Sequence, residues 1–372
     1  MPIKVLSIFG TRPEAVKMAP VVHALARTPG IDSQVCVTAQ HREMLDQVLN
    51  LFDIKPDIDL DLMRPGQSLA ELTARVIKHL DPVLQKIQPD WVLVQGDTTT
   101  VMTAALTAFY AGIKVGHVEA GLRTGDKRQP FPEEINRRVA AVVADLHFAP
   151  TEWSRNNLLA ENIPDDHIIV TGNTAIDALH WVVKQPFDLD SVNIPALKDS
   201  SVRTVLVTAH RRENFGRPIE DICNALRTLA DHYAGSVHFV YPVHLNPNVQ
   251  EPVNRMLGDH PHVSLLPPLD YLPLVNVMKK AVLVLTDSGG IQEEAPGLGI
   301  PTLVLRNTTE RPEGVAAGTL KLIGTKSAVI VSEAQKLLDD PAAHAGMAGA
   351  KNPYGDGHAA DRIVAAILNY LL

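Results

Sequence analysis

The sequence contains no long hydrophobic run. No stretch approaches the roughly 18 consecutive apolar residues of a membrane-spanning helix, so we expect no membrane insertion. The N-terminus passes directly into a predicted strand at residues 4–9. It lacks the basic region, apolar region and small-residue cleavage site of a signal peptide. Together these absences predict a cytoplasmic protein.

Cysteine is also scarce in this chain. The only two cysteines, Cys36 and Cys223, stand in apolar patterns far apart in the sequence. Cysteines in such surroundings are usually buried thiols, so we expect neither a disulfide nor a metal site. Free thiols fit the reducing environment of the cytoplasm.

Runs of positive charge are missing as well. The formal net charge is −8, and no lysine- or arginine-rich segment occurs. Nucleic-acid-binding proteins carry a basic patch or stripe, so nucleic acid is not an expected partner. The overall charge still permits a local basic pocket for a phosphorylated small molecule.

Two cofactor signatures are absent. The residues after the first predicted strand, Gly10 to Glu14, lack the G-x-G-x-x-G pattern of dinucleotide-binding folds. No acidic residue stands at the expected ribose position after the second strand, so a nicotinamide redox step is disfavoured. No cysteine–histidine cluster has the spacing of a transition-metal site. We therefore expect neither a redox cofactor nor a catalytic metal.

The pattern that is present is an alternation of short apolar runs with helical segments. Such alternation is typical of α/β folds, and continuous apolar runs indicate parallel strands covered by helices on both faces. The predicted strands span residues 4–9, 34–38, 90–94, 114–118, 146–149 and 168–170, and then 204–208, 237–241, 263–266, 282–285 and 302–305. With 372 residues and about 150 residues per domain, this predicts two doubly wound, Rossmann-like domains facing a cleft.

The rhythm breaks at residues 182–201, which contain Pro186 and Pro195 and indicate a linker with a short insertion. We predict a first domain at residues 1–172 and a second at residues 173–356. The chain ends in a predicted helix, residues 357–372. This helix could cover the second sheet or cross back to the first domain, and we expect it to cross back.

One segment of the second half suggests a ligand. The apolar run that ends at Leu285 is followed by Ser288-Gly289-Gly290 and by a helix that carries Glu293 and Glu294. Backbone amides at a helix start bind anions, and glycine lets a phosphate approach closely. Such a segment can hold the diphosphate of a nucleotide sugar, with the ribose on Glu294. The alternative is a plain turn, because Ser-Gly-Gly is common.

Polar residues also follow the other predicted strands, and ligands of open α/β sheets bind outside the carboxyl ends of the strands. Each residue has an ordinary structural explanation too: Asp97 as a helix N-cap, Glu133 as an acidic residue of a first turn, Lys17 as a surface lysine. Their joint placement favours a polar site. The set comprises Arg12, Lys17, Gln40, His41, Glu43, Asp97 and Glu119, and then His210, Arg211, His244, Asp287, Arg306 and Arg311.

These residue types suit the departure of a nucleoside diphosphate from a sugar. Cations and helix N-termini stabilise the negative charge that grows on the leaving group. The candidates are Arg12, Lys17, His210, Arg311 and the amides of Ser288-Gly289-Gly290. Carboxylates handle protons on the sugar. A simple glycosyl transfer needs at most one base, so three or more candidate carboxylates suit a reaction that also breaks a C–H bond.

Several long motifs in a fixed order resemble bacterial non-hydrolysing UDP-N-acetylglucosamine 2-epimerases, and the resemblance covers essentially the whole chain. In the first half the motifs are Phe9-Gly10-Thr11-Arg12-Pro13-Glu14-Ala15, Thr38-Ala39-Gln40-His41-Arg42, Gln95-Gly96-Asp97-Thr98-Thr99, Gly116-His117-Val118-Glu119-Ala120-Gly121-Leu122-Arg123-Thr124, Pro132-Glu133-Glu134 and Thr171-Gly172-Asn173-Thr174. In the second half they are Thr208-Ala209-His210-Arg211-Arg212-Glu213-Asn214, Tyr241-Pro242-Val243-His244-Leu245-Asn246-Pro247, Ser288-Gly289-Gly290, Thr309-Glu310-Arg311-Pro312-Glu313 and Asn352-Pro353-Tyr354-Gly355-Asp356-Gly357.

The resemblance implies two Rossmann-like domains arranged as in GT-B glycosyltransferases, in a homodimer. It implies reversible inversion at C2 between UDP-N-acetylglucosamine and UDP-N-acetylmannosamine. The implied mechanism is elimination of UDP to 2-acetamidoglucal followed by re-addition, without a cofactor. The product would supply N-acetylmannosamine units for surface polysaccharide. Three alternatives stay open: a hydrolysing relative that releases N-acetylmannosamine and UDP, a GT-B glycosyltransferase, and a non-catalytic UDP-sugar-binding regulator.

Residue roles follow from the matching motifs. The catalytic residues implied are Asp97, Glu119, Glu133 and His210, without a choice of which carboxylate removes the C2 proton from which epimer. The substrate- and UDP-binding residues implied are Arg12, Lys17, Arg137, Ser288, Gly289, Gly290, Glu294 and Arg311. A second, activating UDP-N-acetylglucosamine is expected on Gln40, His41, Glu43, Gln67, Arg211 and His244. Glu43 and Gly66 depart from some family versions, and Gln95 stands where histidine is common.

Overall fold

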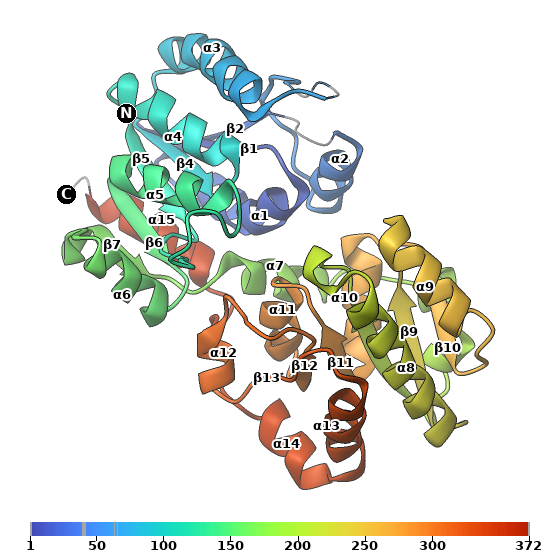
Figure 1. Ribbon diagram of the computed structural model, residues 1–372. Helices are drawn as coiled ribbons and strands as arrows, with labels where there is room; N and C mark the ends of the chain where they lie inside the picture. The colour runs from blue at the N-terminus through green and yellow to red at the C-terminus, as the bar shows by residue number, and fades with distance from the viewer. Residues whose placement is uncertain (1, 39–41, 63, 65, 371–372) are drawn as a thin grey trace. The chain divides into compact units, whose positions relative to one another are not determined.

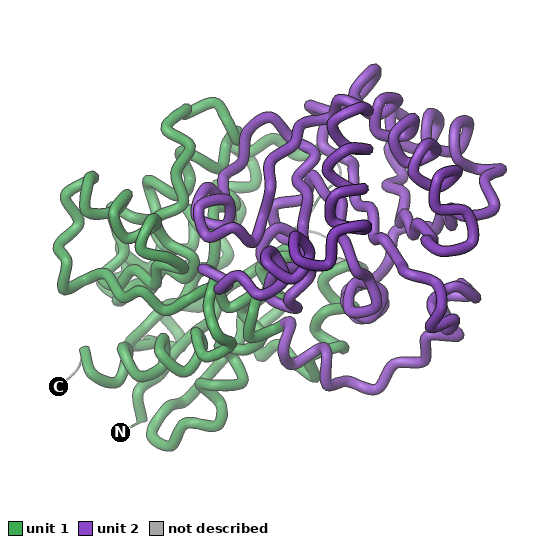
Figure 2. The backbone as a smooth tube through the Cα atoms, turned by 90° about the horizontal axis from the view of Figure 1, so that it is seen from below, with its two compact units in different colours: residues 1–178, 354–372 green, residues 179–353 purple. Residues whose placement is uncertain are grey.

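The computed structural model describes residues 2–38, 42–62, 64 and 66–370, and side chains 42 and 43 are outside the description. The chain forms two compact units (Figures 1 and 2). Unit 1 contains residues 1–178 and 354–372, and unit 2 contains residues 179–353. Each unit is built around one parallel β-sheet, which confirms the predicted α/β class with two Rossmann-like domains.

Unit 1 is built on a seven-stranded sheet with the order β3-β2-β1-β4-β5-β6-β7. Its strands are β1 (Ile3–Phe9), β2 (Ile31–Val37), β3 (Ile58–Asp59), β4 (Trp91–Gln95), β5 (Lys114–Val118), β6 (Leu146–Ala149) and β7 (Ile168–Val170). All neighbouring pairs are parallel. The strand order reverses between β1 and β4, and such a switch point is where α/β sheets bind ligands.

Helices connect these strands, as parallel pairing requires (Figure 1). They are α1 (Arg12–Arg27), α2 (Arg42–Leu51), α3 (Leu69–Ile87), α4 (Thr99–Tyr110), α5 (Glu133–Val143), α6 (Glu152–Ala160) and the 3₁₀ turn η1 (Asp165–His167). Capping boxes begin α1, at Thr11 and Glu14, and α3, at Ser68 and Glu71. Such reciprocal bonds satisfy amides that the first helical turn leaves open.

Unit 2 is built on a six-stranded parallel sheet with the order β10-β9-β8-β11-β12-β13, and its switch point lies between β8 and β11. The strands are β8 (Arg203–Thr208), β9 (Val237–Pro242), β10 (Val263–Leu266), β11 (Ala281–Thr286), β12 (Thr302–Val304) and β13 (Leu320–Leu322). The connecting helices are α8 (Arg217–His232), α9 (Pro247–Leu257), α10 (Tyr271–Lys280), α11 (Ile291–Gly297), α12 (Pro312–Ala316), α13 (Ser327–Asp339) and α14 (Pro341–Ala348).

The chain passes between the units through α7 (Thr174–Val182) and returns at Tyr354. The final helix, α15 (Ala359–Tyr370), belongs to unit 1 and contacts α1, which confirms that it crosses back. The Asp177 carboxylate accepts hydrogen bonds from the first amides of this helix, Ala359 N at 3.2 Å and Ala360 N at 2.9 Å. Arg362 donates to the carbonyl of Thr171 at 2.9 Å.

The predicted strands are all present, but two further strands were missed. Both β3 (Ile58–Asp59) and β13 (Leu320–Leu322) lie at sheet edges and have two and three residues. Runs this short carry no periodic pattern. The predicted linker contains the 3₁₀ turns η2 (Leu189–Val192) and η3 (Pro195–Leu197).

The two cysteines are free and buried, as predicted. Burial raises the pKa of the Cys36 and Cys223 thiols to about 12. Among the helices of the described residues, none combines the length and apolar character that a bilayer crossing requires. The domain boundaries predicted at residues 172 and 356 stay a prediction.

Asp177→Ala should lower the free energy of unfolding by about 1–3 kcal/mol, because it leaves two buried amides of α15 without an acceptor. Urea denaturation followed by circular dichroism measures this change. Arg27→Ala is the control, since the Arg27–Asp361 pair is exposed and should change stability by about 0.5 kcal/mol or less. Equal effects of the two changes would contradict this account of α15.

Candidate functional site

In unit 1 a buried carboxylate marks the carboxyl end of β5. Glu119 follows this strand directly and has a left-handed backbone, with φ of 62°. Its Oε1 accepts from Lys17 Nζ, and from Asn173 Nδ2 at 3.3 Å. Its Oε2 accepts from Gln95 Nε2. Lys17 belongs to α1, Gln95 ends β4, and Asn173 follows β7. The carboxylate therefore links three other segments of unit 1.

Asp97 lies beside Glu119, just after β4. Its Oδ2 is 3.0 Å from Arg137 Nη2 in α5, and its side chain is 30% exposed. Asn136 of the same helix donates to the Asp97 carbonyl at 2.9 Å. Burial and the neighbouring carboxylates Glu119 and Glu133 raise the pKa of Asp97, outweighing the opposing effect of Arg137. A carboxylate with a raised pKa is a better proton acceptor near neutral pH.

The pair Glu133–Glu134 divides into two environments. Glu134 is fully buried and accepts from the amides of Thr124 at 3.1 Å and Gly125 at 3.3 Å. It also pairs with Arg138 at 3.2 Å. Glu133 has a buried Oε2 without a hydrogen-bond partner within the described part of the chain. Glu134 therefore shapes the loop before α5, whereas Glu133 keeps an oxygen that can accept a proton.

At the end of β1 the acidic residue has a structural task. Glu14 is 2% exposed and accepts from the amides of Gly10 at 2.8 Å and Thr11 at 2.7 Å. Burial raises its pKa despite these bonds and one from Thr98. Arg12 is the first residue of α1 and is partly exposed. The motif thus combines a buried helix cap with an accessible cation.

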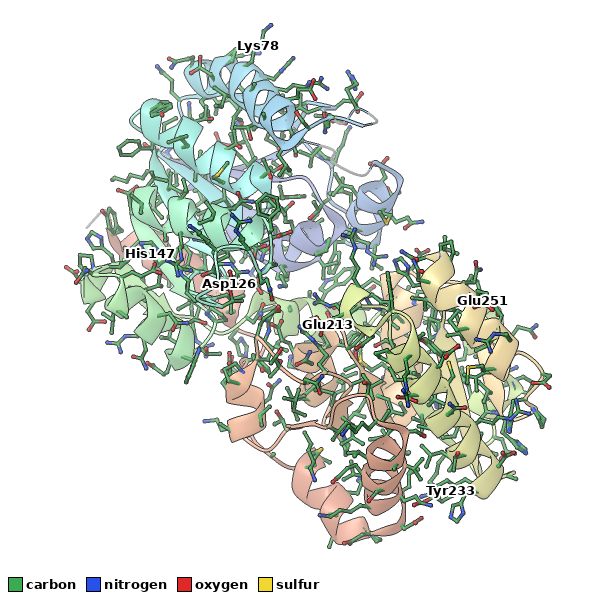
Figure 3. All side chains as sticks on the ribbon, in the orientation of Figure 1. Lys78, Asp126, His147, Glu213, Tyr233 and Glu251 are labelled. Carbon is green, nitrogen blue, oxygen red and sulfur yellow. The ribbon has the colours of Figure 1, made fainter. Side chains whose placement is uncertain are left out.

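In unit 2 the loop after β8 carries several predicted site residues. The His210 ring is stacked on His244, with centroids 5.5 Å apart and 14° between the planes. Asn246 N donates to His244 Nδ1 at 3.0 Å. Further along this loop Glu213, labelled in Figure 3, accepts from Nε of Arg306, which follows β12, at 2.6 Å. The segments after β8, β9 and β12 thus bring two imidazoles and several guanidinium groups to the carboxyl ends of the sheet.

The Ser288-Gly289-Gly290 segment follows β11 and leads into α11, as predicted. A Cβ on Gly289 would lie 3.4 Å from Arg211 Nη2 and 3.9 Å from Arg311 Nη2. Glu310 Oε2 would lie at 3.9 Å as well, so two guanidinium groups and one carboxylate approach the backbone at this glycine. The two guanidinium groups are the feature that suits an anion. Arg311 Nε also donates to Glu293, so its orientation is fixed by a buried carboxylate.

Glu294 lies in the first turn of α11 and is 8% exposed. The Tyr271 hydroxyl donates to its Oε1 at 3.2 Å. Burial, with the negative charge of Glu294, raises the pKa of Tyr271 well above its usual value, so the phenol stays protonated and keeps donating. This bond holds the Glu294 carboxylate in place.

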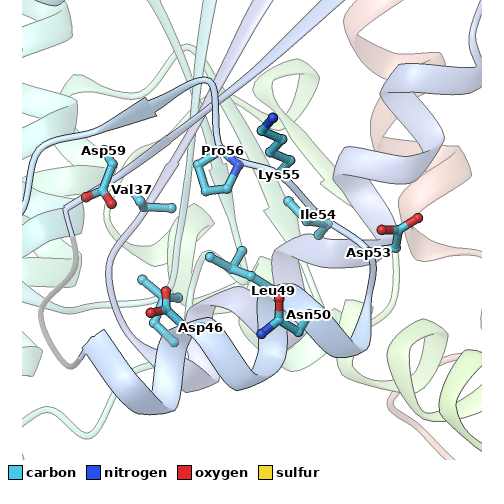
Figure 4. Close-up of a pocket in the computed structure, with 10 residues that line it drawn as sticks. Val37, Asp46, Leu49, Asn50, Asp53, Ile54, Lys55, Pro56 and Asp59 are labelled. Atoms are coloured by element: carbon cyan, nitrogen blue, oxygen red, sulfur yellow. The ribbon is translucent and has the colours of Figure 1, made fainter.

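A separate pocket of about 480 Å³ lies in unit 1 (Figure 4). Its lining residues come from β2, α2, the segment that leads to β3, and β3; they are Val37, Leu45, Asp46, Leu49, Asn50, Asp53, Ile54, Lys55, Pro56 and Asp59. None of them is a predicted site residue. Within the described ranges, no group of three His, Cys, Asp or Glu residues could hold a metal ion.

Comparison with known proteins gives one consistent result. A family model described as UDP-N-acetylglucosamine 2-epimerase matches residues 23–368. The UDP-N-acetylglucosamine 2-epimerase of Escherichia coli K12 is 56% identical over 373 residues, 99% of each chain. That of Bacillus subtilis 168 is 53% identical over 98% of this chain and 95% of its own.

Solved structures agree with this result. The UDP-GlcNAc 2-epimerase from Neisseria meningitidis, bound to UDP-GlcNAc, has a TM-score of 0.89 and 50% identity over 99% of this chain and 100% of its own. The chain belongs to the UDP-N-acetylglucosamine 2-epimerase family. A glycosyltransferase from Rickettsia africae, only 12% identical with a TM-score of 0.66, shares the fold, as the predicted GT-B likeness requires.

For this epimerase-family chain, the structure brings the predicted residues of unit 1 together. Lys17, Glu119, Asp97 and Arg137 form consecutive ion pairs or charge contacts, and Glu133 influences Asp97. The predicted residues of unit 2 gather after β8, β9 and β11. Gln40, His41 and the Glu43 side chain lie outside the described residues. Gln67 precedes α3, where Arg75 Nη1 donates to its Oε1 at 3.4 Å.

The sequence alone gave no individual role to three polar residues that contact the predicted site residues, although Asp287 was among the polar residues that follow the predicted strands. Gln95 and Asn173 donate to Glu119, and Asp287 accepts from the loop that carries His210. All three stand at or just after the carboxyl end of a strand, and that position was the available signal.

Asp97→Asn should raise the free energy of unfolding at about pH 7. The folded-state pKa of Asp97 is raised, so its ionised form costs stability at neutral pH and its protonated form does not. The gain should shrink as the pH falls through the folded-state pKa and vanish below the unfolded value of about 3.9. Urea denaturation of both proteins at about pH 8 and pH 5 measures this; a gain that grows on acidification would contradict the raised pKa.

Proposed function

We propose that the protein interconverts UDP-N-acetylglucosamine and UDP-N-acetylmannosamine by inversion at C2 and retains the UDP-sugar throughout. Membership of the UDP-N-acetylglucosamine 2-epimerase family, with 56% identity over 99% of the chain, carries this conclusion. The three carboxylates that follow β4 and β5 in unit 1, Asp97, Glu119 and Glu133, support it, because a C2 inversion needs proton transfer on both faces of the sugar.

The reaction proposed is elimination followed by addition. The C2 hydrogen of the substrate is not acidic, so the C1–O bond must break first and place positive charge at C1. A carboxylate then removes the C2 proton, and the products are UDP and neutral 2-acetamidoglucal. Re-addition delivers a proton to the opposite face of C2 and rejoins the UDP oxygen to C1.

The environments of the three carboxylates suggest different tasks. Asp97 has a raised pKa and Glu133 has a buried oxygen without a partner among the described residues. Both features suit groups that gain and lose protons. Glu119 accepts from three donors, which favours its anionic form. We assign Glu119 to stabilising positive charge at C1, and proton transfer on the two faces to Asp97 and Glu133.

The leaving group is assigned to the residues of unit 2. In this proposal Ser288, Gly289 and Gly290 hold the diphosphate, Glu294 the ribose, and Arg311 and His210 the growing negative charge. Arg12, Lys17 and Arg137 add positive charge around the sugar and diphosphate. Holding UDP after the C1–O bond breaks allows it to return to C1.

Three further parts of the proposal come from the family likeness. A second UDP-N-acetylglucosamine is assigned to Gln67, Arg211 and His244, with Gln40, His41 and Glu43. The protein is taken to act as a homodimer. Its product is taken to supply N-acetylmannosamine units for surface polysaccharide. The protein is assigned to the cytoplasm, a reducing compartment that suits its two buried free thiols.

Incubation with UDP-N-acetylglucosamine in deuterated water tests the reaction. We expect both UDP-sugars to carry deuterium at C2, because the abstracted proton exchanges with solvent, and NMR measures the label. Accumulation of free N-acetylmannosamine would instead identify a hydrolysing enzyme. Unlabelled, unchanged substrate would identify a binding protein.

Asp97→Asn should lower turnover by at least about 100-fold, because an amide cannot accept the C2 proton. UDP binding, measured by calorimetry, should change little. Asp90→Asn is the matched control. The Asp90 carboxylate accepts from Lys4 N at 2.8 Å, and Asp90 precedes β4, at the amino end of the strand that Asp97 follows. Turnover by Asp97→Asn at the control's rate would contradict the assignment.

A further inference from the structure

Asp287 is a fully buried acidic residue between β11 and the Ser288-Gly289-Gly290 segment. The strand before it pairs with β8, and the order of the sheet reverses between these two strands. Asp287 therefore stands at the switch point of unit 2, where α/β sheets bind their ligands.

One oxygen of this carboxylate holds the loop after β8. Asp287 Oδ2 accepts from the amides of His210 and Arg211, both at 2.8 Å, and from Asn214 Nδ2 at 2.9 Å. Three donors on one buried oxygen leave the loop backbone little freedom. The position of the His210 ring thus depends on Asp287.

The other oxygen faces the His210 ring itself. Asp287 Oδ1 is 3.7 Å from His210 Nδ1 and has no hydrogen-bond partner within the described part of the chain. A buried carboxylate oxygen without a donor is costly, and a proton on Nδ1 of the nearby ring would offset that cost. The ring is also stacked on His244, which limits its rotation.

We propose that Asp287 is a positioning residue for His210. Its Oδ2 fixes the backbone of His210, and its Oδ1 keeps a proton on Nδ1, so that the ring presents its Nε2 edge to the departing diphosphate. Asp287 itself contacts no substrate in this arrangement. The inference rests on the proposed function, in which His210 assists the departure of UDP.

Asp287→Asn tests this directly. The amide oxygen can still accept from the three donors of the loop, but the NH₂ group that replaces Oδ1 has no negative charge to favour a proton on His210 Nδ1. We expect kcat to fall roughly 10- to 100-fold, with KM changed less than about threefold. An unchanged kcat in a protein that epimerises UDP-N-acetylglucosamine would overturn the proposal and leave the proposed function intact.

Asp177→Asn is the matched control. Asp177, in α7, is another buried carboxylate that accepts hydrogen bonds from two backbone amides, but these amides belong to the start of α15. The two amides bind different carboxylate oxygens, so this change disturbs local structure more than Asp287→Asn does. Its kcat should stay within about twofold of the unmodified value; a loss as large as that of Asp287→Asn would overturn the proposal.

A double-mutant cycle separates positioning from a general structural effect. In the His210→Gln background, Asp287→Asn should lower kcat less than about threefold, since the ring on which it acts is absent. Losses that multiply would overturn the proposal. Because kcat of His210→Gln is itself reduced, single-turnover measurements are used for both backgrounds.

The protonation of the His210 ring gives a readout that does not need activity. Nitrogen NMR of protein with ¹⁵N-labelled histidine, assigned with His210→Gln, should show the proton on Nδ1, and Asp287→Asn should move it to Nε2. A proton on Nε2 alone in the unmodified protein would overturn the proposal, even if the variant does not fold. Absence of any turnover in the unmodified protein would defeat the proposed function, and the ring signal would still decide the role of Asp287.

Discussion

The buried ion pair between Lys17 and Glu119 is the interaction on which the site of unit 1 depends. Both side chains are largely buried, at 16% and 5% exposed, so an unpaired charge on either would be costly. Gln95 and Asn173 complete the set of donors to Glu119. Four separate elements must therefore end at the right place for this one carboxylate to be satisfied, and the same placement sets Asp97 and Arg137 beside it.

Each unit repeats this design at the carboxyl ends of its strands. A carboxylate stands just after a central strand and accepts from neighbouring segments: Glu119 after β5 and Asp287 after β11. Each of these carboxylates accepts hydrogen bonds from more than one segment of its unit. A buried carboxylate with several donors can hold several segments at once, which fixes the polar side chains that they carry.

Asp97 differs from these well-bonded carboxylates. Its raised pKa means that the ionised form is held at a cost to stability, near two other carboxylates. Glu14 and Glu134 are also acidic and buried, but each accepts hydrogen bonds from backbone amides and has a structural role. A raised pKa therefore identifies a function only together with position: Asp97 is 30% exposed, whereas Glu14 is enclosed as a helix cap.

The sequence by itself determined the α/β class, the positions of the longer strands along the chain and the family, because apolar periodicity and ordered motifs are local properties of the chain. The sequence left two places open for the final helix, which returns to unit 1 in the structure. It could not find β3 or β13, whose runs are too short for a pattern. Apart from the family motif, it also could not separate Glu133 from Glu134, or reveal that Gln95, Asn173 and Asp287 hold the residues around them. Those distinctions arise only in the tertiary structure, since burial and hydrogen-bond partners come from segments distant in sequence.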